Sequence, residues 1–222
     1  DDIAFDPVVI EPHASWCVAL NYKAHQEETG LQRSEYPEMF LRVPTSIVGH
    51  RQELLPPPAA YMKAFDFEGE LAVIIGKPGR HIAEKDALAH VAGFSSYNEG
   101  SVRAYQRHNR QFGLGKNFEK SGGFGPWLMT PDEFGDYRKQ SVVTRLNGAE
   151  KQRCGLAEML NSVENQIAYL SEGITLQPGD VIATGTPGSL PGTDKHMQYG
   201  DVVEVEITGL GVLSNRVGSK PA

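Results

Sequence analysis

The sequence is poor in cysteine, has fewer basic than acidic side chains and lacks long apolar runs. Its two cysteines, Cys17 and Cys154, lie far apart without C-x-x-C spacing, which argues against a disulfide framework or a structural zinc site and makes a cytoplasmic compartment the expectation. No apolar run reaches the roughly 18 residues that a membrane-spanning helix needs, so no such helix is expected. The net charge of −7 argues against nucleic acid or an anionic membrane as the main partner.

What the sequence does contain is enough apolar material for a core and many turn-forming residues. Hydrophobic residues make up 40% of the 222 positions and aromatic residues 9%, which is typical of a globular domain rather than a disordered chain. The 24 glycines and 14 prolines indicate many turns and favour strands over a helical bundle. We therefore predict one strand-rich α+β domain over residues 1–222, with 1–14 as a lead-in segment.

Local patterns predict strands and short helices along the chain. Apolar runs between turn residues predict strands over 15–22, 69–76 and 93–100. Apolar residues at helical spacing, or terminal signals, predict helices over 21–30, 83–93 and 159–173. In the first helix, Asn21 is the predicted N-cap and Gly30 the predicted C-terminal stop. Asn147-Gly148 predicts a hairpin turn, and the glycine-rich segment 110–126 is expected to be an irregular loop.

The stretch FDFEGELAVIIGK places carboxylates at every second position and then becomes wholly apolar. Glu68 and Glu70 share one face of the predicted strand, about 6.5–7 Å apart at Cα. Residues 71–75 are apolar on both faces, so the strand runs into the interior, where an unpaired ionised carboxylate costs several kcal/mol. Two such carboxylates can converge on one divalent cation, which offsets that cost. The alternative explanation is the solvent-facing edge of a half-buried strand.

A second E-x-E pair in the same chain provides an internal comparison. In DVVEVEITG, Glu204 and Glu206 alternate cleanly with apolar residues, as expected for a strand with one face in water. We assign that pair to the surface. The difference between the two contexts favours a metal site at Glu68 and Glu70 only.

A third carboxylate would complete a cation site. Glu99 lies at the end of another predicted strand, close in sequence to Arg103 and Gln106. An arginine can bind a carboxylate through two parallel hydrogen bonds, and a glutamine can donate to or accept from a neighbouring oxygen. The alternative for Glu99 is a turn residue in a salt bridge with Arg103.

Three further groups of residues carry candidate chemistry. His25 and Glu28 are three residues apart on a predicted helix, so they can form a hydrogen-bonded general base, although a solvated helix face is the alternative. Lys116 lies among glycines but outside a G-x-x-x-x-G-K-[ST] phosphate loop, and it can face a substrate enolate. Thr184 and Thr186 in ATGTPG can contact a substrate carboxylate, with a tight turn as the alternative.

The order of these motifs resembles the fumarylacetoacetate hydrolase family, in its C-terminal catalytic domain type, from about Ser15 to the C-terminus. The resemblance rests on the succession NYKAHQEE, MFLRVPTSIVG, DFEGELAVIIG, GFSSYNEGSVRAYQ, GKNFEKSGGFGPWLMTPDE, LNGAEKQ, LSEGITLQPGDVIATGTPG and GDVVEVEITGLGVLSNRV. It implies a mixed β-sandwich roll with a few short helices. It also implies a homodimer with a divalent cation, Mg²⁺ or Mn²⁺ and sometimes Ca²⁺, at its centre.

The resemblance also assigns roles by position. Glu68 and Glu70 match the metal ligands, and Glu99 stands where the family usually has Asp. His25 and Glu28 match a catalytic pair on a lid that closes over the substrate, and Lys116 matches a position near the reacting centre. The remaining implied substrate-binding residues are Arg103, Gln106, Thr186 and Tyr22. Two further departures are Ala104, where Asp is common, and Arg42, where Lys is frequent.

These roles predict a metal-dependent hydrolase that cleaves a carbon–carbon bond in an acylpyruvate-like 2,4-dioxo acid. A bound cation would act as a Lewis acid, and His25 with Glu28 would activate water. The same site suits decarboxylation of oxaloacetate-like acids, or isomerisation of 2-oxo or dienedioate acids in aromatic-compound catabolism. A metal-poor, non-catalytic relative is the alternative from a different functional class.

Overall fold

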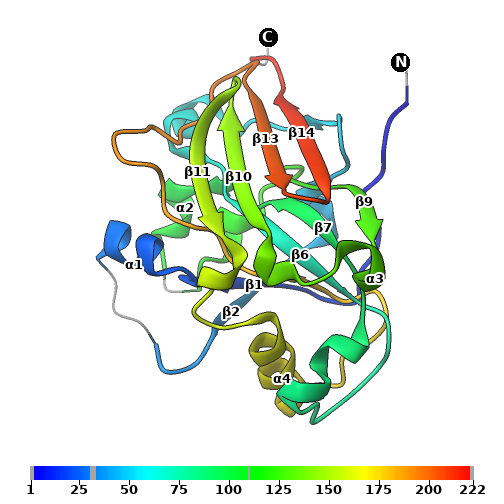
Figure 1. The fold of residues 1–222 in the computed structure, drawn as a ribbon. Helices are drawn as coiled ribbons and strands as arrows, with labels where there is room; N and C mark the ends of the chain where they lie inside the picture. The colour runs from blue at the N-terminus through cyan, green and yellow to red at the C-terminus, as the bar shows by residue number, and fades with distance from the viewer. Residues whose placement is uncertain (1–2, 31–33, 110, 221–222) are drawn as a thin grey trace.

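The computed structural model describes residues 3–30, 34–109 and 111–220, and most of its strands form two sheets that pack against each other (Figure 1). The larger sheet has seven strands in the order β2 (Glu38–Arg42), β1 (Ser15–Ala19), β12 (Val181–Ala183), β6 (Gly69–Ile75), β7 (Val91–Asn98), β9 (Gly122–Met129) and β3 (Ile47–Val48). The smaller has five strands in the order β11 (Ala149–Gly155), β10 (Ser141–Leu146), β13 (Val202–Ile207), β14 (Gly211–Val217) and β4 (Glu53–Leu54). A separate two-stranded pair joins β5 (Phe65–Asp66) to β8 (Ser101–Val102).

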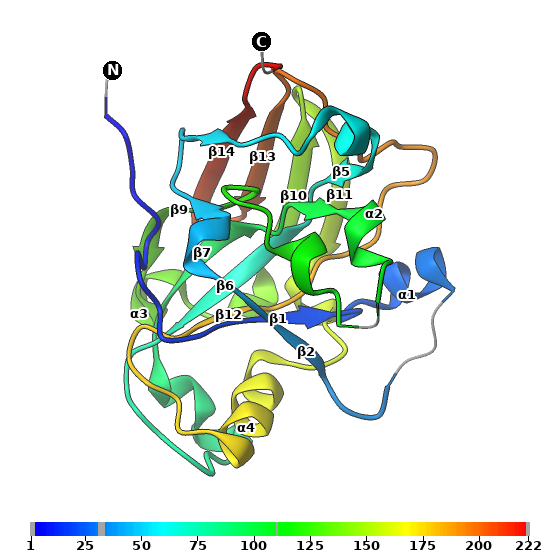
Figure 2. The ribbon, with the colours of Figure 1, turned by 180° about the vertical axis from the view of Figure 1, so that it is seen from behind.

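The helices are short and lie around the sheets. The α-helices are α1 (Lys23–Thr29), α2 (Arg103–Gln106), α3 (Pro131–Phe134) and α4 (Val163–Gly173). The 3-10 helices are η1 (Pro44–Ser46), η2 (Ala59–Ala64), η3 (Glu84–His90), η4 (Gly113–Lys116), η5 (Tyr137–Lys139) and η6 (Leu156–Glu158). Figure 2 shows α1 and α2 on the same side of the molecule. No helix within the described ranges is long and apolar enough to cross a membrane.

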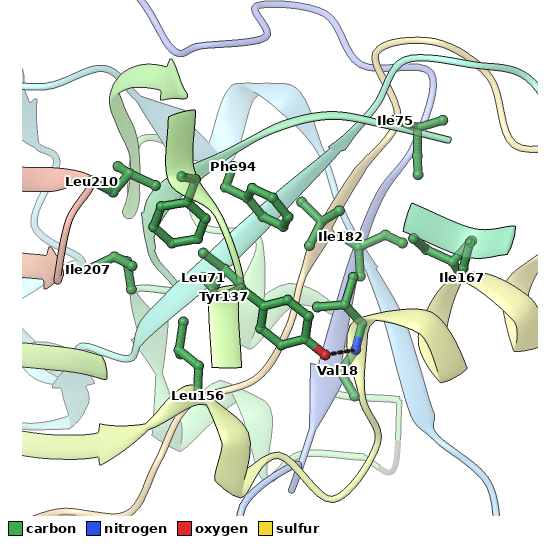
Figure 3. Packing of buried hydrophobic residues seen from close by; sticks show 14 of the residues in the cluster. Val18, Leu71, Ile75, Phe94, Tyr137, Leu156, Ile167, Ile182, Ile207 and Leu210 are labelled. Atoms are coloured by element: carbon green, nitrogen blue, oxygen red, sulfur yellow. Dashed lines mark hydrogen bonds between the residues drawn. The ribbon is translucent and has the colours of Figure 1, made fainter. Parts of the chain in front are cut away.

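Strand β6 is the buried centre of the larger sheet, as its continuous apolar run predicts. It pairs antiparallel with β12 on one side and with β7 on the other, and all seven of its residues are buried. Leu71 packs in the core between the two sheets, together with Phe94, Tyr137 and Ile207 (Figure 3). Ala72 packs in a second apolar cluster on the opposite face. Because both faces are covered by protein, a carboxylate at the entrance of β6 is drawn out of water.

The predicted fold class is confirmed: mixed sheets dominate and the helices are few and short. The predicted hairpin is also present, since β10 and β11 pair antiparallel across Asn147 and Gly148, with φ values of 52° and 78°. Two positive φ values in succession are typical of the type I′ turn that Asn-Gly favours. Gly30 ends α1 in the left-handed conformation, as predicted.

Some local predictions are wrong, and each has a physical reason. Asn21 does not cap α1, which follows Tyr22 instead, because the Asn21 amide donates to the carbonyl oxygens of Asn161 and Thr184 at 3.0 and 2.7 Å. The predicted helix over 83–93 is the 3-10 helix η3, and residues from 91 onward belong to β7.

Two glycines that suggested breaks in structure instead permit close contact between strands. A Cβ at Gly93 would lie 2.5 Å from the carbonyl oxygen of Met129, so this glycine lets β7 approach β9 rather than ending a helix. A Cβ at Gly122 would lie 2.6 Å from the carbonyl oxygen of Asn98. The segment predicted as a loop to residue 126 therefore contains the start of β9.

Candidate active site

One cavity of about 740 Å³ collects nearly all the side chains that the sequence singled out. The predicted site residues that line it are His25, Glu28, Glu68, Glu70, Glu99, Arg103, Gln106, Lys116 and Thr186. Tyr22 is not brought into this group: within the described part of the chain it does not line the cavity, and its hydroxyl is buried without a hydrogen-bond partner. The remaining lining includes the aromatic rings of Phe40 and Phe112.

Two adjacent strands bring three carboxylates together at the floor of the cavity. Glu68 and Glu70 lie just before and within β6, and Glu99 directly follows β7, which pairs antiparallel with β6. The backbone N–H of Glu99 donates to the carbonyl oxygen of Glu68 at 2.8 Å. One oxygen from each of the three side chains lies within 4.8 Å of the others, and the residues are only 3%, 1% and 2% exposed.

Arg103 binds two carboxylates at the start of this region. Its Nε donates to Asp66 at 2.7 Å and its Nη2 to Glu68 at 2.8 Å, while Nη1 donates to Gln106 at 2.8 Å. Burial alone would lower the pKa of Arg103, but Glu68 and Asp66 raise it above its ordinary value. Within the described residues the alternative of a Glu99–Arg103 salt bridge is not realised, since the ion-pair partners of Arg103 are Asp66 and Glu68.

Lys116 supplies the second positive charge. Its Nζ forms ion pairs with Glu68 and with Glu99, the latter at 2.9 Å, and lies 5.3 Å from the centre of the Phe40 ring. Burial opposes protonation of Lys116, but the two carboxylates raise its pKa above the ordinary value. Burial likewise opposes ionisation of Glu68, yet Arg103 and Lys116 together hold its pKa well below the usual range.

The cluster as described still has more negative than positive groups. The ion pairs among the described residues bring two cations, Arg103 and Lys116, to the group Asp66, Glu68, Glu70 and Glu99, which would leave two negative charges if all four carboxylates were ionised.

Two oxygens in this cluster show where a cation would fit. Glu70 accepts a hydrogen bond from the Gly185 N–H at 2.8 Å, and burial, followed by the charges of Glu99 and Glu68, raises its pKa well above the usual range. Oε1 of Glu99 is buried and has no hydrogen-bond partner among the described residues. Carboxylate oxygens are the ligands that hard divalent cations prefer, so the donor set and its unbalanced charge fit Mg²⁺, Mn²⁺ or Ca²⁺.

His25 and Glu28, the predicted general-base pair, lie on α1 at the wall of the cavity. Nδ1 of His25 lies 3.0 Å from Oε2 of Glu28, which leaves Nε2 of the imidazole available on a residue that lines the cavity. The hydrogen bond from His25, assisted by Ser189 and Lys195, holds the pKa of Glu28 well below the usual range against the effect of burial. His25 is 9% exposed, so a simple solvated helix face does not describe it.

The two threonines of ATGTPG have different environments. Thr184 is fully buried and donates its hydroxyl to the carbonyl oxygen of Leu71 at 3.0 Å, so it fastens this segment to β6. Thr186 lines the cavity, and its hydroxyl accepts a hydrogen bond from Gln152 at 2.9 Å. Of the pair, Thr186 is the one placed to contact a substrate.

Arg42, which the resemblance places where the family often has Lys, is buried. Its guanidinium donates to the carbonyl oxygen of Gly100 at 3.0 Å and to Ser121 at 2.9 Å. Because Gly100 follows Glu99, this contact fixes the backbone that carries the third carboxylate.

Sequence reasoning missed three polar residues around the cavity. Ser189 and Lys195 contact Glu28, and Gln152 contacts Thr186. Ser189 and Lys195 lie outside the quoted motifs, Gln152 ends the stretch LNGAEKQ without a role assigned to it, and the partners of all three are distant in sequence. Only the three-dimensional fold identifies them.

The sequence and the fold are similar to those of known proteins. The fumarylacetoacetate (FAA) hydrolase C-terminal family matches residues 14–218. The human mitochondrial oxaloacetate tautomerase FAHD2A is 38% identical over 221 residues, which cover 97% of this chain and 70% of that protein. The structure of 5-carboxymethyl-2-hydroxymuconate delta-isomerase from Mycobacterium smegmatis has a TM-score of 0.84 and 32% identity, covering 98% of this chain and 83% of the other.

A third relative has been solved with ligands. The structure of fumarylpyruvate hydrolase from Pseudomonas aeruginosa, in complex with Mn²⁺ and pyruvate, has a TM-score of 0.84 and 29% identity and covers 98% of both chains. The family match spans most of the sequence, and the similarity extends to enzymes that tautomerise, isomerise and hydrolyse. The chain belongs to the fumarylacetoacetate hydrolase family.

Proposed function

We propose that this protein is a divalent-metal-dependent enzyme that catalyses keto–enol tautomerisation of a 2-oxo dicarboxylic acid of the oxaloacetate type. The observation that carries this proposal is the buried cluster of three carboxylates with Lys116, in the same cavity as the His25–Glu28 pair. The 38% identity to an oxaloacetate tautomerase over 97% of the chain supports the choice of reaction.

Glu68, Glu70 and Glu99 would hold the cation. When bound, the cation supplies Lewis-acid polarisation of the substrate's 2-oxo group. The ammonium of Lys116, beside the same carboxylates, stabilises the negative charge that develops on the 2-oxo oxygen as a proton leaves the adjacent carbon. Buried, water-poor surroundings make this stabilisation stronger than in water.

The His25–Glu28 pair would move the proton. Glu28 accepts the Nδ1–H of His25 and orients the ring, so Nε2 takes the proton from the carbon next to the 2-oxo group and returns it to oxygen or carbon. Thr186 and Gln106 line the cavity and have the hydrogen-bonding groups to orient a substrate carboxylate.

Hydrolysis of an acylpyruvate is the second candidate. It is favoured by the same histidine–carboxylate pair and by similarity to a fumarylpyruvate hydrolase over 98% of both chains. In this reaction His25 takes a proton from water as the oxygen attacks the 4-carbonyl. The carbon–carbon bond then breaks, its electron pair enters the pyruvate enolate beside Lys116, and a proton returns to that carbon.

A substrate panel distinguishes these reactions. Purified protein with Mg²⁺ or Mn²⁺ is mixed with freshly dissolved enol-oxaloacetate, and the ultraviolet absorbance of the enol is followed while mass spectrometry measures total oxaloacetate. We expect metal-dependent loss of the enol with total oxaloacetate unchanged. Acetate and pyruvate from acetylpyruvate would favour the hydrolase, and pyruvate with CO₂ from oxaloacetate would indicate a decarboxylase. No metal-dependent conversion of either compound would overturn the proposal.

A further inference from the structure

Glu28 of α1 is held by the chain segment that follows Thr186. The segment 187–195 follows Thr186 between β12 and β13, and it passes close to α1 in both views of the ribbon (Figures 1 and 2). The N–H of Ser189 donates to Glu28 at 3.3 Å, and its hydroxyl donates to the other carboxylate oxygen. The ammonium of Lys195 lies 3.4 Å from Glu28, and Lys195 is only 8% exposed.

The backbone of this segment also lies against the backbone of α1. A Cβ built at Gly188 would lie 3.0 Å from the carbonyl carbon and oxygen of Ala24 and 3.2 Å from the nitrogen of His25. Such distances are tighter than ordinary van der Waals contact, so only glycine lets the segment and α1 approach this closely without a shift. The contact therefore combines close backbone packing with polar bonds to one carboxylate.

The segment is in turn tied to the strand that carries the metal-site carboxylates. The buried Gln152 donates to the hydroxyl of Thr186 at 2.9 Å and to the carbonyl oxygen of Pro187 at 2.7 Å. The same side chain accepts from the N–H of Gly69 at 3.0 Å, between Glu68 and Glu70 in sequence. A continuous set of hydrogen bonds thus runs from β6 to α1.

We propose that Ser189 and Lys195 are positioning residues that latch α1 over the cavity and keep Glu28 as the orienting partner of His25. This inference deepens the proposed function, and its catalytic part rests on that function. It makes His25 the proton acceptor and Glu28 the group that fixes the ring.

The contacts around Glu28 explain this division of roles. Its two oxygens accept from His25, from two groups of Ser189 and from Lys195. Hydrogen bonds and a nearby cation favour the ionised form of a carboxylate, so a proton on Glu28 would cost these contacts. A fully exposed ion pair would add little. Here the Lys195 side chain is 9% exposed and the Glu28 side chain 37%, so the pair is partly shielded from solvent.

The test uses full-length, Mn²⁺-loaded protein with the substitutions Lys195→Met and Ser189→Ala. Amide hydrogen exchange over residues 23–29 measures the latch without reference to any reaction. Steady-state tautomerisation of oxaloacetate measures kcat and KM. We expect exchange in α1 to rise several-fold and kcat to fall on the order of 10-fold, with KM changed by less than about 3-fold, because the orientation of His25 matters most in the transition state.

Three further variants sharpen the interpretation. Lys195→Arg retains the positive charge and should restore most of the exchange protection and kcat. Gly188→Ala removes no polar group but adds a methyl group against α1, so it should raise exchange in the same direction. Lys23→Met is the matched control, because Lys23 pairs with Glu27 in solvent, with side chains 80% and 68% exposed, and it should leave both readouts unchanged.

Parental exchange in α1 and parental kcat in both Lys195→Met and Ser189→Ala would overturn the inference. Circular dichroism of each variant identifies a folding defect, and the exchange data then come from whichever of Lys195→Met, Ser189→Ala and Gly188→Ala folds. If the parent converts no 2-oxo acid, the proposed function fails, while the exchange measurement still decides whether the latch exists.

Discussion

The two E-x-E pairs of this chain have the same spacing but opposite environments. Glu68 and Glu70 are 3% and 1% exposed at the entrance of β6. Glu204 and Glu206 lie on β13, where half-buried residues alternate regularly with buried ones, and Glu206 accepts from Arg145 at 2.7 Å near the surface. The residues that follow each pair account for the difference, since β6 continues apolar on both faces and β13 does not.

This comparison shows what a buried carboxylate requires. On β13 the solvent stabilises the charges of Glu204 and Glu206, and the ion pair between Arg145 and Glu206 adds little to that stabilisation. On β6 the structure supplies Arg103 and Lys116, and the charge balance leaves room for a divalent cation. Carboxylate spacing alone therefore does not identify a metal site; spacing together with burial and unmatched charge does.

The largest expected difference between the two pairs is in metal binding. Glu70→Gln keeps an acceptor for the Gly185 N–H but removes the charged ligand. We expect its affinity for Mn²⁺, measured by calorimetry, to fall by at least about 100-fold, because changes to residues that only support metal ligands already cost roughly 10- to 100-fold. Glu204→Gln, the matched control, should bind like the parent. Equal affinities in all three proteins would contradict the distinction between the pairs.

Removing the positively charged side chain beside each pair should also affect catalysis differently. Lys116→Met removes a positive charge from the buried cluster, so we expect kcat for tautomerisation to fall about 100- to 1,000-fold, as for the loss of one transition-state donor. Metal affinity should not fall, because Lys116 competes with the cation for Glu68 and Glu99. Arg145→Met, beside Glu206, should leave kcat unchanged. Loss of metal binding in Lys116→Met would assign the lysine a different role.

The effect of pH should be specific to the buried pair. Glu70 has a raised pKa because of burial and then Glu99 and Glu68, so the metal-free folded protein binds this proton more tightly than the unfolded chain does. The resulting stability is present below the ordinary glutamate pKa of 4.5 and is lost as pH rises toward the raised value. A cation displaces that proton.

The increase in melting temperature caused by Mn²⁺ should therefore grow with pH above about 4.5. Thermal unfolding with and without Mn²⁺ over a pH series measures this. Glu70→Gln should lose the pH-dependent part of the increase. If the increase in melting temperature caused by Mn²⁺ became smaller as pH rises above about 4.5, the assignment of Glu70 as a metal ligand would be contradicted.

The smallest effect is expected at the surface pair. Glu206→Gln removes a partly exposed ion pair with Arg145, so urea denaturation should show a change in the free energy of unfolding of less than about 1 kcal/mol. A loss above about 2 kcal/mol would mean that Glu206 resembles the buried pair more than its exposure indicates.

The parts of the fold that follow from local residue patterns were predictable. The apolar run of β6 and the Asn147-Gly148 turn each express a preference that neighbouring residues determine. The sequence prediction placed Gly93 at the end of a helix and Gly122 in a loop. In the structure each glycine leaves room for the backbone of a neighbouring strand, and sequence alone does not show which strands become neighbours.

The candidate site likewise contains residues that the sequence predicts and contacts that it does not. Glu68 with Glu70, and His25 with Glu28, are recognisable because each pair is close in sequence and needs only a strand or helix to meet. Glu28 also contacts Ser189, which lies 161 residues away, and no spacing rule connects such positions. Long-range polar contacts of this kind emerge only from the packing of the two sheets and their connecting segments.

A crystal structure of the protein grown with Mn²⁺, with anomalous scattering collected near the manganese edge, tests the central claim most directly. The account predicts one strong anomalous peak between the side chains of Glu68, Glu70 and Glu99, with Lys116 beside it. An empty cluster at saturating Mn²⁺, with Lys116 still bound between Glu68 and Glu99, would contradict it.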